Sequence, residues 1–188
     1  MSTSLEQQIQ VLANCGISLV PEVMPDHLLA MFDRADYESE PYVMLLTAMG
    51  SEMDVEPFII PSNDIWHFDT ECIEDHNDYV RIAQRLADLA GGDLPLDDLK
   101  DYVDVEEGVA WLSFASNGQH VRWDAKVEDD WVDATILSRF AELLRSRATG
   151  RQYTYYDLGG QDCLLGCATP ENLQRLRAAT GMNFTWLA

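Results

Sequence analysis

The stretch that decides the fold class is residues 109–127, which read VAWLSFASNGQHVRWDAKV. Its Asn117-Gly118 pair stands between two apolar runs, which is a strong short-range signal for a two-residue β-hairpin turn. After the turn, four apolar residues alternate with three charged ones, a pattern typical of a strand with one buried and one solvent-facing side. With a further turn at residues 106–108, the segment 99–127 is predicted to form a three-stranded antiparallel meander.

The segments on either side of the meander carry helical and strand patterns. The clearest helix covers residues 78–90, where apolar residues recur at spacings of three and four, and Gly91-Gly92 ends the pattern. Further helices are predicted between Ser4 and Gly16, after Pro25, at 41–49, after Asp133 and after Thr169, and further strands at 65–72, 152–158, 161–168 and 184–187. We therefore predict an α+β fold, with a mainly antiparallel sheet, helices packed on one face, and a single domain spanning residues 1–188.

The composition predicts a folded protein outside the membrane. Of the 188 residues, 47% are apolar and 10% aromatic, which is enough for one sizeable core and too much for a disordered chain. The N-terminal MSTSLEQQIQ has neither the basic nor the apolar region of a secretory signal, and the longest apolar runs are far too short to cross a bilayer. We expect a cytoplasmic protein with no membrane partner.

Net charge is the strongest functional signal in the sequence. The chain has 33 acidic and 12 basic residues, a balance of −21. Residues 1–135 carry 29 acids and 6 bases (−23), whereas residues 136–188 carry 4 acids and 6 arginines (+2). Such a charge repels nucleic acid and attracts a basic protein partner, so no direct nucleic-acid binding is expected. The same charge is also compatible with an acidic host proteome or with simple solubility.

An acidic segment begins within the strand predicted at residues 65–72 and continues beyond it. It contains Asp69, Glu71, Glu74, Asp75 and Asp78, crowded around His67 and His76. Carboxylates are the ligands that hard cations prefer, and on a strand the first two would share a face with the preceding histidine. The segment fits no known metal motif, and acids before a helix also complement its dipole. A metal site, a partner-facing acidic rim and a solvated turn therefore remain as alternatives.

Trp131 lies within the acidic stretch DDWVD at residues 129–133. Asp133 is well placed as the N-cap of the helix that follows, and Trp131 could pack as the hydrophobic residue before that cap. Alternatively, a tryptophan flanked by acids could anchor a basic partner. The sequence is compatible with both roles.

Catalytic signals are weak throughout the chain. No Ser/His/Asp arrangement stands out, and the four histidines are scattered along the sequence. The GGQD stretch at residues 159–162 matches no phosphate-binding or nucleophile motif, and its glycines are expected to supply positive φ angles in a turn. We therefore predict no catalytic residues, no bound metal and no cofactor.

Three stretches resemble landmarks of small acidic bacterial proteins of unassigned activity. They are residues 66–80 (WHFDTECIEDHNDYV), 129–133 (DDWVD) and 157–164 (DLGGQDCL). In size, acidity and architecture the chain also resembles the cytoplasmic immunity proteins of bacterial polymorphic-toxin and contact-dependent-inhibition systems. That resemblance implies a stoichiometric inhibitor that binds a cognate toxin domain, often a basic nuclease, and blocks its active site.

The leading expectation is therefore a non-enzymatic acidic binding protein, most specifically an immunity protein that neutralises a cognate basic toxin domain. The competing expectation is a metal-dependent hydrolase that uses Asp69, Glu71 and Asp75. The residues predicted to bind the partner are Trp66, Asp69, Glu71, Asp75 and Trp131.

Overall fold

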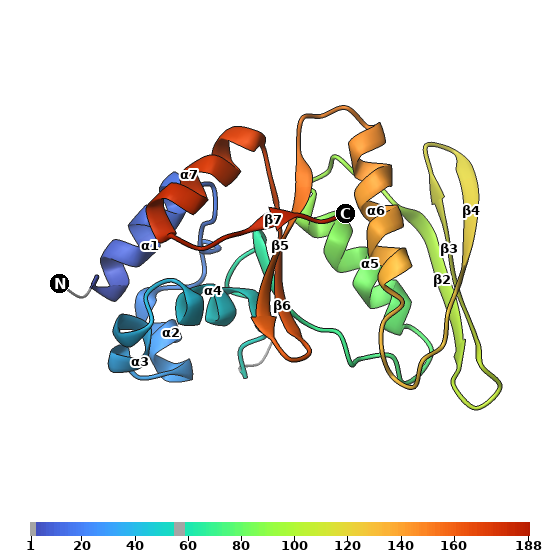
Figure 1. Ribbon diagram of the computed structural model, residues 1–188, viewed down its shortest axis with the longest axis horizontal. Coiled ribbons are helices and arrows are strands. Elements are labelled where there is room, and N and C mark those ends of the chain that lie inside the picture. Colours follow the sequence, from blue (N-terminus) through green and yellow to red (C-terminus); the bar gives the residue numbers. More distant parts are fainter. Residues whose placement is uncertain (1–2, 55–58) are drawn as a thin grey trace. The chain divides into compact units, whose positions relative to one another are not determined.

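The computed structural model describes residues 3–54 and 59–188 and has an α+β fold. It divides into two compact units. Unit 1 comprises Met1–Phe68 and Thr154–Trp186, and unit 2 comprises Asp69–Tyr153 with Leu187–Ala188. The single domain expected from the sequence stays a prediction. Figure 1 labels the helices and strands of both units.

Unit 1 combines five helices and a four-stranded sheet among the described residues. The helices are α1 (Leu5–Asn14), α2 (Pro25–Met31), α3 (Arg34–Ser39), α4 (Val43–Gly50) and α7 (Pro170–Thr180). The strands are β1 (Ile65–Asp69), β5 (Gln152–Gly159), β6 (Asp162–Ala168) and β7 (Thr185–Trp186), in the spatial order β1-β6-β5-β7. Its core is apolar and includes Leu5, Leu12, Leu28, Leu45, Leu46, Met49, Ile65, Leu164, Leu173 and Phe184.

A buried glutamine joins the helices of unit 1. The Gln8 side-chain amide donates to the carbonyls of Thr3 and Tyr37 at 2.9 and 2.8 Å. Its oxygen accepts the backbone N–H of Tyr42 at 2.8 Å. Because Gln8 is fully buried, these three bonds satisfy polar groups that would otherwise destabilise the fold. They connect α1 to the adjacent α3 and to the start of α4.

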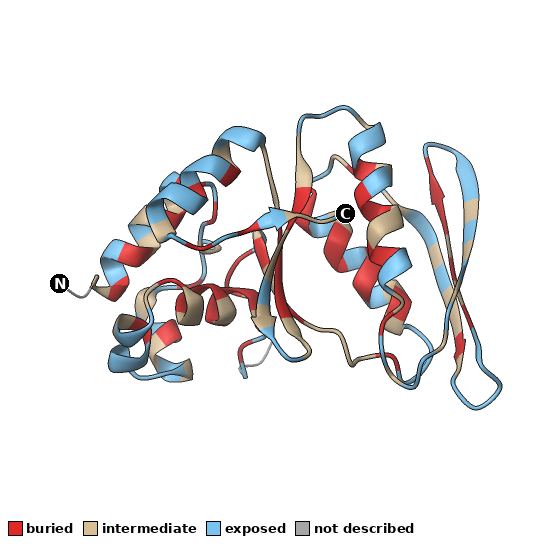
Figure 2. Ribbon diagram, viewed as in Figure 1, coloured by how far each residue is buried: buried red, intermediate tan, exposed pale blue. Residues whose placement is uncertain are grey.

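Unit 2 contains the predicted meander with two helices on one face. The strands are β2 (Asp97–Asp104), β3 (Val109–Ser116) and β4 (Gln119–Ala125), and the helices are α5 (Asp78–Leu89) and α6 (Ala134–Ser146). Asn117 and Gly118 both have positive φ, 51° and 74°, as the predicted hairpin turn requires. Leu112 and Phe114 are buried, and Phe114 stacks on Phe140 of α6. Figure 1 shows α5 and α6 on the same side of the meander, and Figure 2 shows buried stretches on β3 and on both helices.

The α+β class, the antiparallel strand pairing and the meander are therefore confirmed. Two details differ from the predictions: the strands form two sheets rather than one, and α3 was not predicted. The strand expected at residues 65–72 ends at Asp69. It ends there because an Asp69 carboxylate oxygen accepts the N–H of Glu71 at 2.8 Å, which turns the chain.

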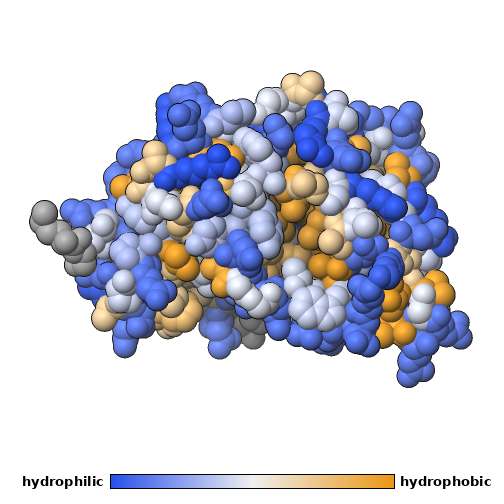
Figure 3. Space-filling model, viewed as in Figure 1, coloured by the Kyte–Doolittle hydropathy of each residue, from blue (hydrophilic) through white to orange (hydrophobic). Residues whose placement is uncertain are grey.

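The charge contrast along the sequence does not separate the two units. Unit 1 carries 14 acids and 3 bases (−11), and unit 2 carries 19 acids and 9 bases (−10). The contrast disappears because residues 136–153, with four of the C-terminal arginines, fold into the same unit as the acidic segment 69–135. On the face drawn in Figure 3, hydrophilic side chains predominate and hydrophobic side chains show between them. Among the helices that the structure describes, none combines the length and apolarity needed to cross a membrane.

Candidate functional site

Two acidic segments of unit 2 are joined side by side by their backbones. The N–H of Val132 donates to the carbonyl of Thr70, and the N–H of Ile73 donates to the carbonyl of Asp130, both at 2.8 Å. Between these bonds, Glu71 and Trp131 form an antiparallel bridge. The structure thus brings together the acids after β1 and the acids before α6.

We call the resulting surface the Trp131 patch. It consists of Asp69, Glu71, Asp75, Glu128, Asp129, Asp130 and Trp131. The Trp131 side chain is 42% exposed, whereas Val132 beside it is buried at 9%. Because successive side chains of an extended segment point to opposite sides, burial of Val132 turns Trp131 outward. Val132, rather than Trp131, is therefore the buried apolar residue just before α6.

Carboxylates near the patch also organise the local backbone. One Asp78 oxygen accepts the N–H groups of Glu74 and Asp75, both at 2.8 Å. The Asp101 carboxylate, from β2, accepts the N–H groups of Asn77 and Val80 at 2.7 and 3.1 Å and so caps α5. The side chain of Asn77, which occupies the N-cap position itself, makes no capping bond.

Burial and negative charge act together on Cys72, next to Glu71. Burial, together with the negative charges of the nearby Asp78, Asp69 and Asp130 and against a lowering by Arg81, raises the pKa of the Cys72 thiol to about 12. The cysteine is therefore a neutral thiol at physiological pH and a poor nucleophile.

The carboxylates of the hydrolase alternative do not converge on a metal site. Among the described residues there is no group of three or more His, Cys, Asp or Glu side chains that could hold a metal ion. Asp69 accepts the N–H of Glu71, and an Asp75 oxygen lies 3.3 Å from His76 Nδ1. Because β1 ends at Asp69, Glu71 lies beyond the strand and does not share a strand face with His67.

Trp66 is the one predicted partner-binding residue that belongs to unit 1. Its ring packs against that of Phe68, with centroids 4.3 Å apart. The other four predicted residues, Asp69, Glu71, Asp75 and Trp131, belong to unit 2 and to the patch. Trp66 is therefore not counted among the residues of the Trp131 patch.

A further polar chain in unit 1 joins residues that are far apart in the sequence. Ser51 Oγ lies 3.1 Å from His67 Nδ1, and His67 Nε2 lies 3.2 Å from an Asp162 oxygen. Gly50 permits this approach, because a Cβ there would overlap the His67 backbone nitrogen. No Ser/His/Asp arrangement was predicted, because these positions have no diagnostic spacing in the sequence.

The surroundings of the Ser51 hydroxyl are those of a structural group. Ser51 Oγ donates to the carbonyl of Thr47, one turn earlier in α4, at 2.8 Å. Ser51 also follows the C-terminal end of α4, where the helix dipole disfavours the negative charge that develops during attack by a serine. We therefore assign a structural role to Ser51, His67 and Asp162, whose contacts join the end of α4 to β1 and β6.

The meander has an outer face, opposite to α5 and α6, that carries an aromatic row. The residues of this outer face are Lys100, Tyr102, Asp104, Val109, Trp111, Ser113, His120, Arg122 and Asp124. The Tyr102 and Trp111 rings are nearly parallel, at 11°, with centroids 6.3 Å apart. The Arg122 guanidinium lies 4.4 Å from the Trp111 ring centroid. This row was not predicted, because aromatic residues in strands are usually assigned to the buried side.

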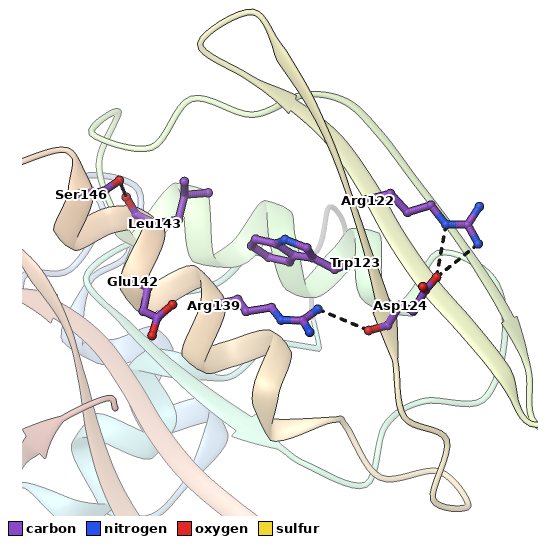
Figure 4. Close-up of a pocket in the computed structure, with 7 residues that line it drawn as sticks. All are labelled: Arg122, Trp123, Asp124, Arg139, Glu142, Leu143 and Ser146. Carbon is purple, nitrogen blue, oxygen red and sulfur yellow. Dashed lines mark hydrogen bonds and ion pairs between the residues drawn. The ribbon is translucent and has the colours of Figure 1, made fainter.

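Two hollows border β4. The larger, of about 640 Å³, lies between β4 and α6 and is lined by Arg122, Trp123, Asp124, Arg139, Glu142, Leu143 and Ser146 (Figure 4). Arg139 donates to the Asp124 carbonyl at 3.3 Å, and Arg122 donates to the Asp124 carboxylate at the same distance. Both arginines are thus held at the strand. The smaller hollow, of about 340 Å³, also includes Arg122 in its lining.

In comparisons with protein-family models, curated proteins and solved structures, nothing matches this chain.

Proposed function

We propose that this protein is a non-enzymatic acidic binding protein of the cytoplasm, and specifically an immunity protein that neutralises a cognate basic toxin domain in a bacterial toxin system. The observation that carries the proposal is the Trp131 patch, in which an exposed tryptophan stands among six carboxylate residues from two chain segments. Neither a catalytic group nor a cofactor takes part in the proposed activity.

The carboxylates and the tryptophan would act on different steps of binding. A net charge of −21 accelerates encounter with a basic protein, since complementary charge can raise association rates from about 10⁵–10⁶ to about 10⁸ M⁻¹ s⁻¹ or more at low salt. A tryptophan that becomes desolvated in an interface contributes about 2 kcal/mol or more and slows dissociation. An inhibitor that must capture a toxin before it acts needs both properties.

Backbone geometry prepares the patch for binding. The hydrogen bonds from Val132 and Ile73 fix the two segments to each other before any partner arrives. Little conformational entropy is then lost on association, which improves affinity for a given contact area. The patch therefore supplies a preformed surface to a basic partner.

The test is co-expression with the toxin domain encoded beside this protein's gene. Expression of that domain alone is expected to arrest bacterial growth, and co-expression of this protein is expected to restore it. Trp131→Ala and Asp75→Lys should each weaken the rescue, because the first removes the anchor and the second reverses an exposed charge in the patch.

Matched controls come from exposed positions of unit 1. Met24→Ala removes an apolar side chain that is 59% exposed, and Glu22→Lys reverses an exposed acid, and both should protect like the wild-type protein. Growth arrest that persists despite abundant wild-type protein would contradict the proposal. Protection by the Trp131→Ala variant equal to that by the wild-type protein would show that the Trp131 patch is not the binding surface.

A further inference from the structure

A row of polar side chains, two of them cationic, crosses the outer face of the meander. Lys100 lies opposite Ser113 across β2 and β3, and Ser113 lies opposite Arg122 across β3 and β4. His120, two residues before Arg122, projects on the same face. These four residues line the hollow of about 340 Å³. One ligand in that hollow could therefore meet two cationic side chains, an imidazole and a hydroxyl group.

Two of these basic side chains lack an acidic partner among the described residues, although acids outnumber bases by 33 to 12. Within residues 3–54 and 59–188, neither Lys100 nor His120 forms an ion pair. The other lysine, Lys126, is paired with Glu128. Arg122 is paired with Asp124, but both side chains are exposed, so an external anion can compete for the guanidinium. In such an acidic chain, basic groups left unpaired at the wall of a hollow point to an anionic ligand.

The neighbouring row on the same face consists of flat aromatic groups. Trp111 precedes Ser113 by two residues on β3, and Tyr102 follows Lys100 by two residues on β2. Side chains two apart on one strand project from the same face and are within reach of a single small molecule. Aromatic rings and guanidinium planes are the groups on which proteins stack nucleobases. The Arg122 guanidinium already lies over the Trp111 ring, so a base beside the anion-binding row would add to an existing stack of Tyr102, Trp111 and Arg122.

The negative charge of the whole chain limits how large this ligand can be. At physiological ionic strength, charges further apart than about 8 Å are largely screened, so the groups in the hollow dominate for one bound anion. Asp98 also lines the hollow, and Asp124 forms an ion pair with Arg122 of its lining. A nucleic-acid strand would carry further phosphates past unit 2, whose balance is −10. A mononucleotide keeps its charge within the hollow.

We propose that the outer face of the meander binds a nucleoside phosphate. Its phosphate lies in the hollow and is held by Lys100, Arg122, His120 and Ser113, and its base stacks against the row formed by Tyr102 and Trp111. This site shares no residue with the Trp131 patch and does not rest on the proposed immunity function.

Isothermal titration calorimetry tests the proposal on the full-length protein, at 0.15 M salt with EDTA present. The probes are AMP, ATP, adenosine and inorganic phosphate. We expect saturable 1:1 binding of AMP and ATP, with adenosine and phosphate each at least about tenfold weaker, because each provides only half of the contacts. Lys100→Ala should weaken AMP binding at least about tenfold. Tyr102→Leu should weaken AMP binding without changing the affinity for inorganic phosphate, because it leaves the contact between the Arg122 guanidinium and Trp111 in place.

The matched control is Lys126→Ala, which removes the other lysine, outside the hollow, and should leave AMP binding unchanged. Circular dichroism of each variant verifies that the fold is intact, and Arg122→Lys provides a milder second variant on the phosphate side. Absence of saturable heat with both AMP and ATP would overturn the proposal. Equal AMP affinities of the wild-type and Lys100→Ala proteins would overturn it as well.

Discussion

Trp131 and Glu71 lie opposite each other in an antiparallel bridge, although sixty positions separate them in the chain. The bridge joins the acidic segment that leads into α5 to the acidic segment that surrounds the exposed Trp131. It converts two acidic turns, each unremarkable alone, into one continuous surface. The proposed binding surface therefore depends on a tertiary contact and not on either segment by itself.

Exposure of Trp131 predicts that its removal costs little stability. Trp131→Ala should change the free energy of unfolding by less than about 1 kcal/mol, since the side chain is 42% exposed. Phe140→Ala should cost about 3–5 kcal/mol, because Phe140 is fully buried against Phe114 and Trp123. Urea denaturation followed by circular dichroism measures both values, and similar losses for the two variants would contradict the assigned exposure.

The Asp101 carboxylate is predicted to stabilise the N-terminus of α5 from a neighbouring strand. Asp101→Ala should cost about 0.5–2 kcal/mol, because it leaves the N–H groups of Asn77 and Val80 without their acceptor. Hydrogen exchange should accelerate at Val80, and the exposed Asp97→Ala variant on the same strand serves as the control. Unchanged exchange at Val80 in the Asp101 variant would show that α5 does not depend on this cap.

Asp133 should make folding stability depend on acid pH. Burial raises the pKa of Asp133, but hydrogen bonds from the N–H groups of Lys126 and Thr135 outweigh it, so the pKa lies below its ordinary value of 3.8. The carboxylate therefore stabilises the fold above pH 3.8, and this contribution is lost as the pH falls through the lowered pKa. Asp133→Asn should lower stability by about 1–2 kcal/mol at pH 6 and by less near pH 3, because an amide has only one oxygen to accept the two N–H groups.

Denaturant titrations at several pH values check this prediction. Asp129→Asn is the matched control, because Asp129 is exposed and an asparagine tolerates its positive φ of 49°. That variant should unfold with nearly wild-type stability at both pH values. A stability difference between wild type and Asp133→Asn that stays constant from pH 6 to pH 3 would contradict the lowered pKa.

Cys72 is predicted to react slowly with alkylating reagents in the native state. Its pKa of about 12, against an ordinary value of 9.0, lowers the thiolate fraction at pH 8 by about three orders of magnitude. The greater basicity of the thiolate recovers part of that loss, so labelling should be more than about tenfold slower than in urea. Mass spectrometry of iodoacetamide-treated protein gives the two rates, and equal rates would refute the assigned burial of Cys72.

The sequence predicted those elements whose signals are local. The Asn117-Gly118 turn depends on backbone preferences of two residues, and both indeed adopt positive φ. The apolar spacing of α5 and the N-cap at Asp133 are likewise encoded within a few positions. In contrast, α3 is six residues long with Tyr37 as its buried residue, and so short a segment has no helical periodicity to detect.

Long-range contacts determine the parts of the site that could not be predicted. Four of the five predicted partner-binding residues lie in one patch, but Trp66 belongs to unit 1. The Asp69 turn that separates Glu71 from β1 depends on one side-chain hydrogen bond, and the Asp101 cap depends on packing of β2 near α5. The stacking row on the outer face depends on strand register, which a sequence pattern alone does not fix.

Surface plasmon resonance with the purified protein and the purified toxin domain proposed as its partner tests the role of the Trp131 patch most directly. We predict that Trp131→Ala leaves the association rate constant within about threefold of wild type and raises the dissociation rate constant about thirtyfold or more, the equivalent of about 2 kcal/mol. Asp75→Lys should mainly slow association and weaken its salt dependence. Wild-type dissociation of the Trp131→Ala variant would contradict the assignment of this patch as the binding surface.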